Sequence, residues 1–319
     1  MRYYLDFEKK LEPIERRIDE IERFYNVNDP RYAKEVSFLT KKISKLKKDI
    51  YSDLTNWQRS QISRHLNRPH TLDYITNLFS DFFEIHGDRK YKDDPAIVCG
   101  FARFDGIKLA VIGHQKGQDV REMAKRNLGM AHPEGYRKAI RIMELANRWG
   151  KPIVTFIDTP GAFPGVGAEE RGQAEAIASS ICYMFSLSVP IVTIVIGEGG
   201  SGGALAIGVG DRVLMLENAT YSVISPEGCA SILWRDGSKK SLAAESLKPT
   251  AYELFKLKVI DDVIKEPFGG AHRNWDETFL NVKGILEKHL MQLMEVPIEE
   301  LQQKRYEKFR RMGIFEETK

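Results

Sequence analysis

The sequence predicts an α/β protein built around a mainly parallel sheet that helices cover on both faces. Two observations carry this prediction. The apolar runs "PIVTFI" at 152–157 and "VPIVTIVIG" at 189–197 lack alternation, as expected for strands that are buried on both faces. Segments with helical periodicity separate these runs along the chain, which favours parallel strands joined by crossover helices.

Residues 1–67 are expected to form a helical arm. Apolar residues recur at three- and four-residue steps over 14–25 and again over 36–50, which is the period of a helix face. The turn-forming "NVNDPR" at 26–31 separates the two runs, so we expect a helical hairpin. Its apolar stripes need a surface to cover them. We therefore expect the arm to dock on a partner, although the basic "KKISKLKKD" at 41–49 is equally typical of a solvated helix face.

The central part of the chain alternates between strand and helix patterns. Asp105 and Gly106 separate two β-rich runs, and Asp-Gly favours the tight turn of a hairpin. Pro133 and Gly150 mark the start and the stop of a helix. The segments expected are a helix at 71–88, the hairpin at 96–117, helices at 133–152 and 168–187, strands at 152–158, 189–197, 212–216, 220–225 and 258–264, and a helical segment at 274–313.

The composition is that of a globular protein with nearly balanced charge. The 319 residues are 42% hydrophobic and 29% charged, with a formal net charge of +3, which does not demand nucleic acid. Cys99, Cys182 and Cys229 lie far apart, so neither a zinc knuckle nor a disulfide framework is expected. The apolar runs are shorter than a membrane span, and the charged start does not resemble a signal peptide. We therefore expect a reducing, cytoplasmic setting.

Two of the expected strands run into glycine-rich loops, "FIDTPGAFPG" at 156–165 and "GEGGSGG" at 197–203. Glycine lets a ligand approach the backbone closely, and a helix that starts after such a loop offers free N–H groups. Loops on adjacent parallel strands face one crevice at the carboxyl edge of the sheet. Convergent N–H groups there can stabilise an oxyanion. The alternative is that the glycines only permit tight turns and close packing.

Three kinds of chemistry fit these loops. Residues 197–202 match the dinucleotide pattern G-x-G-x-x-G, with Glu217 about 20 residues further on, but little chain is left for a crossover helix. Ser201 is placed like a hydrolase nucleophile served by one of the histidines, although a hydroxyl there also suits a helix cap. The third is thioester enolate chemistry, in which backbone amides hold the charge and no nucleophile is needed.

Longer motifs closely resemble a known family, the α subunits of bacterial acetyl-CoA carboxylase carboxyltransferase. The resemblance covers nearly the whole chain, including the helical arm. The motifs are "RNLGMAHPEGYRKAIRIMELANRWGKPIVTFIDTPGAFPGVGAEERGQAEAIA" at 126–178, "GEGGSGGALAIGVGDRV" at 197–213, "TYSVISPEGCASILW" at 220–234 and "GGAHRN" at 269–274.

The resemblance implies a ClpP/crotonase-like fold of repeated ββα units over 68–296, with 1–67 as a partner-docking arm and 297–319 as a C-terminal helical tail. It implies transfer of a carboxyl group from carboxybiotin, on the biotin carboxyl carrier protein, to acetyl-CoA. The product is malonyl-CoA for fatty acid synthesis, and another acyl-CoA is the nearest alternative substrate.

The same resemblance implies an α2β2 assembly with a separate β subunit that carries zinc and shares the active site. Biotin carboxylase completes the enzyme. This chain is therefore expected to bind no metal and no cofactor of its own, and no membrane. Nucleic acid is not expected as its partner.

The resemblance also implies roles for residues of the loops. The backbone amides of Gly202 and Gly203 are expected to form an oxyanion hole on the biotin side, with Gly161 and Ala162 on the opposite wall. No side-chain base is required, because the ureido nitrogen of biotin can take the proton. From the residues alone, the basic segment 119–130 is placed to meet a CoA phosphate, or else is a solvated helix face. Further residues expected at substrate are Phe163, Gly199, Gly200, Ser201, Arg121, Lys125 and Arg126.

Overall fold

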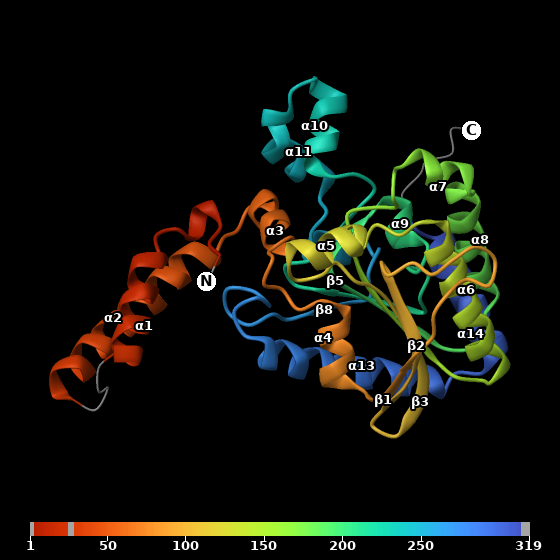
Figure 1. The fold of residues 1–319 in the computed structure, drawn as a ribbon, viewed down its shortest axis with the longest axis horizontal. Coiled ribbons are helices and arrows are strands. Elements are labelled where there is room, and N and C mark those ends of the chain that lie inside the picture. The colour runs from red at the N-terminus through yellow and green to blue at the C-terminus, as the bar shows by residue number, and fades with distance from the viewer. Residues whose placement is uncertain (1–2, 25–28, 314–319) are drawn as a thin grey trace.

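The computed structural model describes residues 3–24 and 29–313, whose strands form one eight-stranded sheet (Figure 1). Its order is β1-β2-β3-β4-β5-β6-β8, with β7 beside β5. The pairs from β3 to β8 are parallel and the β1-β2-β3 edge is antiparallel. The strands are β1 (Ser80–Glu84), β2 (Ile97–Phe104), β3 (Ile107–His114), β4 (Ile153–Thr159), β5 (Ile191–Gly200), β6 (Arg212–Leu216), β7 (Thr220–Ser222) and β8 (Asp262–Ile264).

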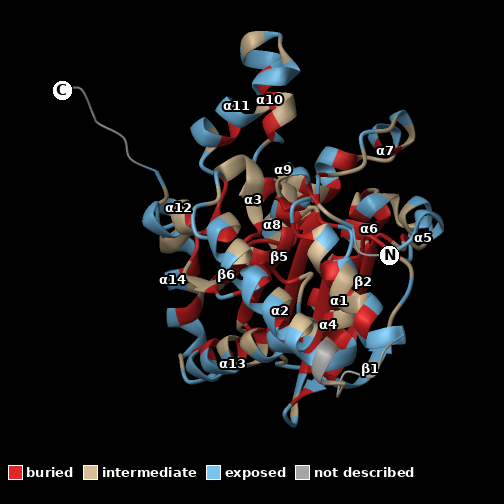
Figure 2. Cartoon of the chain, turned by 90° about the vertical axis from the view of Figure 1, so that its left-hand side faces the viewer, coloured by how far each residue is buried: buried red, intermediate tan, exposed pale blue. Residues whose placement is uncertain are grey.

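The expected parallel core is confirmed. All residues of β4 are buried, as are most of β5, and Figure 2 shows the buried strands between the helices. Asp105 and Gly106 both have positive φ, 45° and 86°, which fits the tight turn predicted between β2 and β3. The prediction of a helix as far as residue 88 is wrong, because α4 (Thr71–Leu78) ends early and β1 pairs with β2.

Helices cover both faces of the sheet. α6 (Pro133–Arg148) and α8 (Gln173–Ser186) pack together on one face, while α4 and α13 (Trp275–Met294) contact each other and the strands elsewhere. No helix within 3–24 and 29–313 is both long and apolar enough to cross a membrane. The other helical elements are α1 (Glu12–Phe24), α2 (Pro30–Tyr51), α3 (Asn56–Ser63), α5 (Val120–Lys125), α7 (Val166–Glu170), α9 (Ser201–Leu205), α10 (Pro226–Trp234), α11 (Lys240–Leu247), α12 (Ala251–Lys256), α14 (Ile298–Arg310), and the 3₁₀ turns Asp6–Glu8, Asn127–Gly129 and Gly237–Lys239.

One buried arginine anchors the last helix to the sheet. Arg305 of α14 is 1% exposed and pairs with Asp211, which precedes β6, at 2.8 Å. The same guanidinium donates to the carbonyls of Met184, Leu187 and Val189 at 2.8–2.9 Å. Every side of this buried charge is therefore satisfied, as burial requires, and α14 is fixed against the end of α8.

The arm is the helical hairpin that the sequence predicted, and it projects from the sheet (Figure 1). Part of its connecting turn, 25–28, lies outside the described residues. The apolar faces of α1 and α2 pack against each other, since Ile14 and Ile18 of α1 contact the buried cluster that contains Ile43 of α2 and Ile62 of α3. The stripes thus cover one another, so they do not by themselves require a partner. Docking of the arm on a partner stays a prediction.

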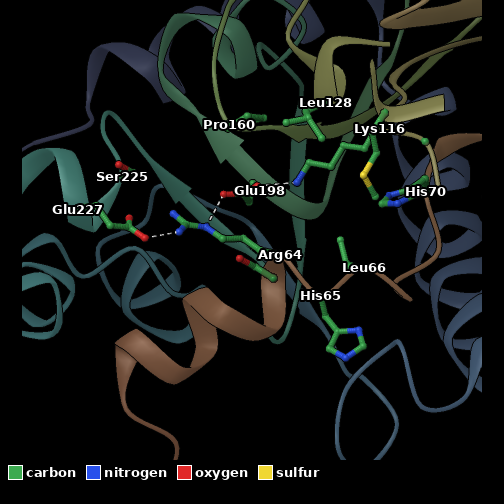
Figure 3. A pocket seen from close by; sticks show the side chains of 13 residues that line it. Arg64, His65, Leu66, His70, Lys116, Leu128, Pro160, Glu198, Ser225 and Glu227 are labelled. Atoms are coloured by element: carbon green, nitrogen blue, oxygen red, sulfur yellow. Dashed lines mark hydrogen bonds and ion pairs between the residues drawn. The ribbon is translucent and has the colours of Figure 1, made fainter. Parts of the chain in front are cut away.

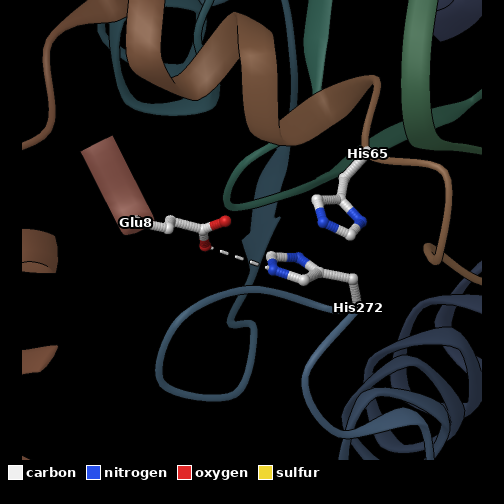
Figure 4. A group of neighbouring side chains, drawn as sticks. All are labelled: Glu8, His65 and His272. Atoms are coloured by element: carbon white, nitrogen blue, oxygen red, sulfur yellow. Dashed lines mark ion pairs between the residues drawn. The ribbon is translucent and has the colours of Figure 1, made fainter. Parts of the chain in front are cut away.

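A buried cluster fastens the base of the arm. Figure 4 shows Glu8, His65 and His272 together, with the two imidazole rings stacked at 3.9 Å between centroids. Both ring nitrogens of His65 already face backbone groups, the carbonyl of Tyr3 and the N–H of Asn67, at 3.1 Å. The carboxylate of Glu8 forms an ion pair with the guanidinium of Arg273 at 3.1 Å. We therefore interpret this cluster as a structural contact that joins the arm to the domain, rather than as a cation site.

Buried histidines predict that stability falls in mild acid. Burial lowers the pKa of His65 and of His114 to about 4, whereas an unfolded histidine titrates near pH ~6.5. Between these values the unfolded chain binds more protons, so the free energy of unfolding falls as the pH falls from about 6.5 to 4. The expected loss is up to about 3 kcal/mol for each histidine, measured by urea unfolding at a series of pH values.

The H65Q and H114Q variants should each flatten that dependence. The control is H86Q, because the side chain of His86 is 62% exposed, and it should leave the slope as in the unmodified chain. An equal slope in all four proteins would assign the pH dependence to other groups.

Candidate active site

The two glycine loops meet at the carboxyl edge of the sheet. β4 and β5 are adjacent and parallel, with Thr159 opposite Gly199. A Cβ on Gly200 would lie 2.1 Å from the carbonyl oxygen of Pro160, and one on Gly203 would lie 2.5 Å from the amide nitrogen of Ala162. In both cases the added Cβ would meet backbone atoms of the other loop, which cannot move aside as a side chain can. Close packing therefore requires glycine at these two positions, whatever ligand they meet.

Gly202 differs from Gly200 and Gly203 because a Cβ at this position would make only ordinary van der Waals contact. A Cβ there would come no closer than 3.6 Å, to the side chain of Ile177. Gly202 lies in the first turn of α9, where N–H groups have no partner inside the helix. Ser201 begins this helix with φ +53° and is exposed, so the chain turns sharply at this point.

A pocket of about 400 Å³ opens beside the loops (Figure 3). Pro160 and Glu198, one from each loop, line it. The other lining residues come from the end of α3, the segment up to α4, the β3–α5 connection, α5 with the 3₁₀ turn after it, and the start of α10. They are Ser63, Arg64, His65, Leu66, His70, Lys116, Gly117, Met123, Leu128, Ser225 and Glu227.

Asp158, near the end of β4, is buried behind this pocket and contacts three of the residues that line it. Its carboxylate lies 2.8 Å from His70 Nδ1 and 2.9 Å from Lys116 Nζ, and it accepts the backbone N–H of Glu198 at 3.0 Å. Burial favours a higher pKa, but Lys116 and His70 outweigh it and hold the pKa of Asp158 below its usual value. Asp158 therefore stays charged and joins the end of β4 to the loop of β5.

The ion pairs continue outward from Lys116. Its ammonium lies 2.6 Å from Glu198, whose second oxygen lies 2.7 Å from Arg64. Arg64 in turn reaches Glu227 of α10 at 2.6 Å. The pKa of Lys116 is raised: burial opposes this, but Asp158 and Glu198 prevail. Both cations are thus occupied by carboxylates, so the pocket does not present free positive charge.

A second pocket of about 270 Å³ lies beside Ser201 and Gly202 and is almost wholly apolar. Burial raises the pKa of Tyr221, one of its lining residues. Gly199 and Gly200 instead line a smaller cleft with Pro160 and Arg64. The remaining lining residues of the apolar pocket are Leu205, Gly208, Val213, Ser222, Val223, Val259, Phe309 and Met312.

The other expected site residues with side chains, Phe163, Arg121, Lys125 and Arg126, line neither of these pockets. Phe163 stacks on His132, with 4.1 Å between ring centroids. Arg121 and Lys125 are exposed on α5, the helix that supplies Met123 to the larger pocket. Arg126 donates to the carbonyl of Pro95 at 2.9 Å, so its guanidinium is already engaged.

The geometry disfavours the two alternatives from other classes. Residues 197–200 belong to β5 itself and α9 has only five residues, which is short for a dinucleotide crossover. Glu217 is already bound by Tyr252 at 2.5 Å. For a hydrolase, Ser201 lines the apolar pocket, and among the described residues that line this pocket there is no histidine to serve as its base.

Sequence reasoning missed the ion-pair chain. Its members lie far apart in sequence, since Arg64 and Glu198 are 134 positions apart. A signal for Asp158 was present, because a carboxylate that ends a wholly apolar strand has to find a buried partner. The missed residues are Arg64, His70, Lys116, Asp158 and Glu198.

Known proteins match the chain over nearly its full length. A family model described as acetyl co-enzyme A carboxylase carboxyltransferase-like matches residues 4–313. The acetyl-coenzyme A carboxylase carboxyl transferase subunit alpha of Syntrophotalea carbinolica is 55% identical over 99% of this chain and 100% of its own length. That of Geobacter metallireducens is 54% identical over 99% of each.

Solved structures share the fold at low identity. Transcarboxylase 12S, with methylmalonyl-coenzyme A and methylmalonic acid bound, has a TM-score of 0.55 and 22% identity, over 70% of this chain and 42% of its own. The beta subunit of geranyl-CoA carboxylase from P. aeruginosa has a TM-score of 0.55 and 17% identity, over 77% of this chain and 46% of its own. The expected crotonase-like fold is thereby confirmed. With the family model and the full-length relatives, this shows that the chain belongs to the acetyl-CoA carboxylase carboxyltransferase family, among its α subunits.

Proposed function

We propose that the chain is the α subunit of the carboxyltransferase of an acetyl-CoA carboxylase. With a β subunit, it transfers the carboxyl group of carboxybiotin to acetyl-CoA and produces malonyl-CoA for fatty acid synthesis. The observation that carries the proposal is identity above 50% to such α subunits over the whole chain. The paired glycine loops at the sheet edge support it, because the reaction needs backbone donors rather than a nucleophile.

The chemistry explains why backbone is exposed at this edge. Carboxybiotin that loses CO2 leaves negative charge on its ureido oxygen, and the thioester oxygen becomes charged when acetyl-CoA loses a methyl proton. Preorganised N–H groups stabilise such charges best where water is excluded. We assign the biotin side to the amides of Gly202 and Gly203. The close approach of Gly203 to Ala162 fixes this turn against the loop that follows β4.

The remaining expectations complete the proposal. We keep Gly161, Ala162 and Phe163, in the loop that packs against Gly203, as substrate-side residues, and we assign the exposed Arg121 and Lys125 to a CoA phosphate. The partners are the β subunit in an α2β2 assembly, the biotin carboxyl carrier protein and biotin carboxylase, in the cytoplasm. Zinc is assigned to the β subunit, and carboxybiotin enters as substrate.

The reverse reaction tests the function. Malonyl-CoA and biocytin should yield acetyl-CoA when this chain is mixed with a zinc-loaded β subunit, and neither subunit should suffice alone because the site is shared. A parallel assay with methylmalonyl-CoA tests the alternative acyl substrate. Absence of turnover in a correctly assembled complex would refute the assignment.

The oxyanion role of Gly202 can be separated from its packing. G202A should fold and retain most activity, because a Cβ there stays at least 3.6 Å from its neighbours. G202P removes the N–H, which as the second of α9 has no acceptor inside the helix. It should lower kcat about 100-fold or more relative to G202A.

The measurement is kcat together with the melting temperature of each variant. Equal kcat for G202P and G202A would show that this amide does not stabilise the transition state. Substitution of Gly203 is unsuitable here, since even alanine would meet the Ala162 nitrogen at 2.5 Å.

A further inference from the structure

Arg64 lies between two carboxylates from separate parts of the fold. It follows the last residue of α3, and its Nε and Nη1 reach Glu198 and Glu227 at 2.7 and 2.6 Å (Figure 3). A planar guanidinium can serve two carboxylates in fixed directions, which a single ammonium does poorly. Arg64 therefore sets the position of one carboxylate relative to the other.

Glu198 belongs directly to the glycine loop of β5. One of its oxygens meets Arg64 and the other meets Lys116, while its backbone N–H bonds to Asp158. Only three residues separate it from Gly202. The loop also holds Ser201 at φ +53°, a conformation that persists only where the surroundings enforce it. The ion pairs of Glu198 with Arg64 and Lys116 therefore help to fix the backbone conformation in which α9 begins.

Glu227 lies in the first turn of α10, and α10 and α11 form a hairpin that projects from the sheet (Figure 1). The hairpin's own core is small, built on Cys229, Ala230 and Ala243. Its second link to the body is at the opposite end of α3, where Glu245 of α11 accepts from the backbone and side chain of Asn56 at 2.9 and 2.8 Å. Both ends of α3 thus bind the hairpin.

We propose that Arg64 is a positioning residue for the carboxyl transfer, and that α3 is a strut which couples the α10–α11 hairpin to the glycine loop. The loop is set for the reaction while the hairpin is docked on α3, and loss of Arg64 uncouples the two. This inference rests on the proposed function. It predicts an effect on turnover rather than on substrate binding, because Arg64 acts through Glu198 and the loop.

The test uses the complete α2β2 enzyme in the reverse reaction with malonyl-CoA and biocytin. R64M should lower kcat about 10- to 100-fold, as expected for misplaced catalytic groups, with KM for malonyl-CoA within about two-fold. R64K should not restore kcat. E227Q should lower kcat by a smaller factor and add nothing in the R64M background, because both changes break the same link.

The matched control is R103M, which removes an exposed pair with Asp81, 2.9 Å apart, at the β1–β2 edge. It should match the unmodified enzyme. Hydrogen exchange supplies a readout besides activity. In R64M, exchange should become faster in 226–234 and also in 199–205, whereas R103M should change neither segment.

Two results would overturn the inference. One is unchanged kcat in R64M. The other is a lower kcat accompanied only by a lower melting temperature, with exchange in 199–205 unaltered, since Arg64 would then be purely structural. Failure of the unmodified complex to turn over would instead refute the proposed function, and the exchange experiment would still decide whether hairpin and loop are coupled.

Discussion

Backbone contact between two loops is the constraint on which the rest of this structure depends. The loops after β4 and β5 touch through main-chain atoms, so no side chain larger than hydrogen fits at Gly200 or Gly203. Such contact is possible only because the parallel register places Thr159 opposite Gly199. The buried core below, the helices on both faces and the position of α9 all serve to keep these two loops in register.

Ion pairs hold the segments beside the two loops in place, as apolar packing holds the strands below them. Buried ion pairs add little net stability, because desolvation offsets most of the attraction. Each does demand its own partner, however, and so excludes other arrangements. Asp158 accepts from His70, Lys116 and the backbone of Glu198. The three segments that carry His70, Lys116 and Glu198 are thereby held in one arrangement around Asp158, which purely apolar packing would leave less defined.

The sequence predicted features that depend on local pattern. The apolar runs without alternation predicted β4 and β5, because a strand that is buried on both faces needs apolar residues on both. Asp105-Gly106 predicted the hairpin, because a positive φ favours these residue types. The strand β1 was missed, since its aromatic residues also continue the helix pattern of α4. The ion-pair chain was missed because its members are joined only by the folded topology, and no spacing in the sequence records that.

The anchor at Arg305 has a consequence for the order in which the molecule is made. Asp211, beside the central strands, receives its guanidinium from a residue 94 positions later in the chain. A ribosome therefore finishes every strand before the charge that secures them has emerged. Until Arg305 has been made, the carboxylate of Asp211 accepts from the backbone N–H of Ile191 but lacks its buried cation. The final packing of the α8 and β6 region therefore has to wait for α14.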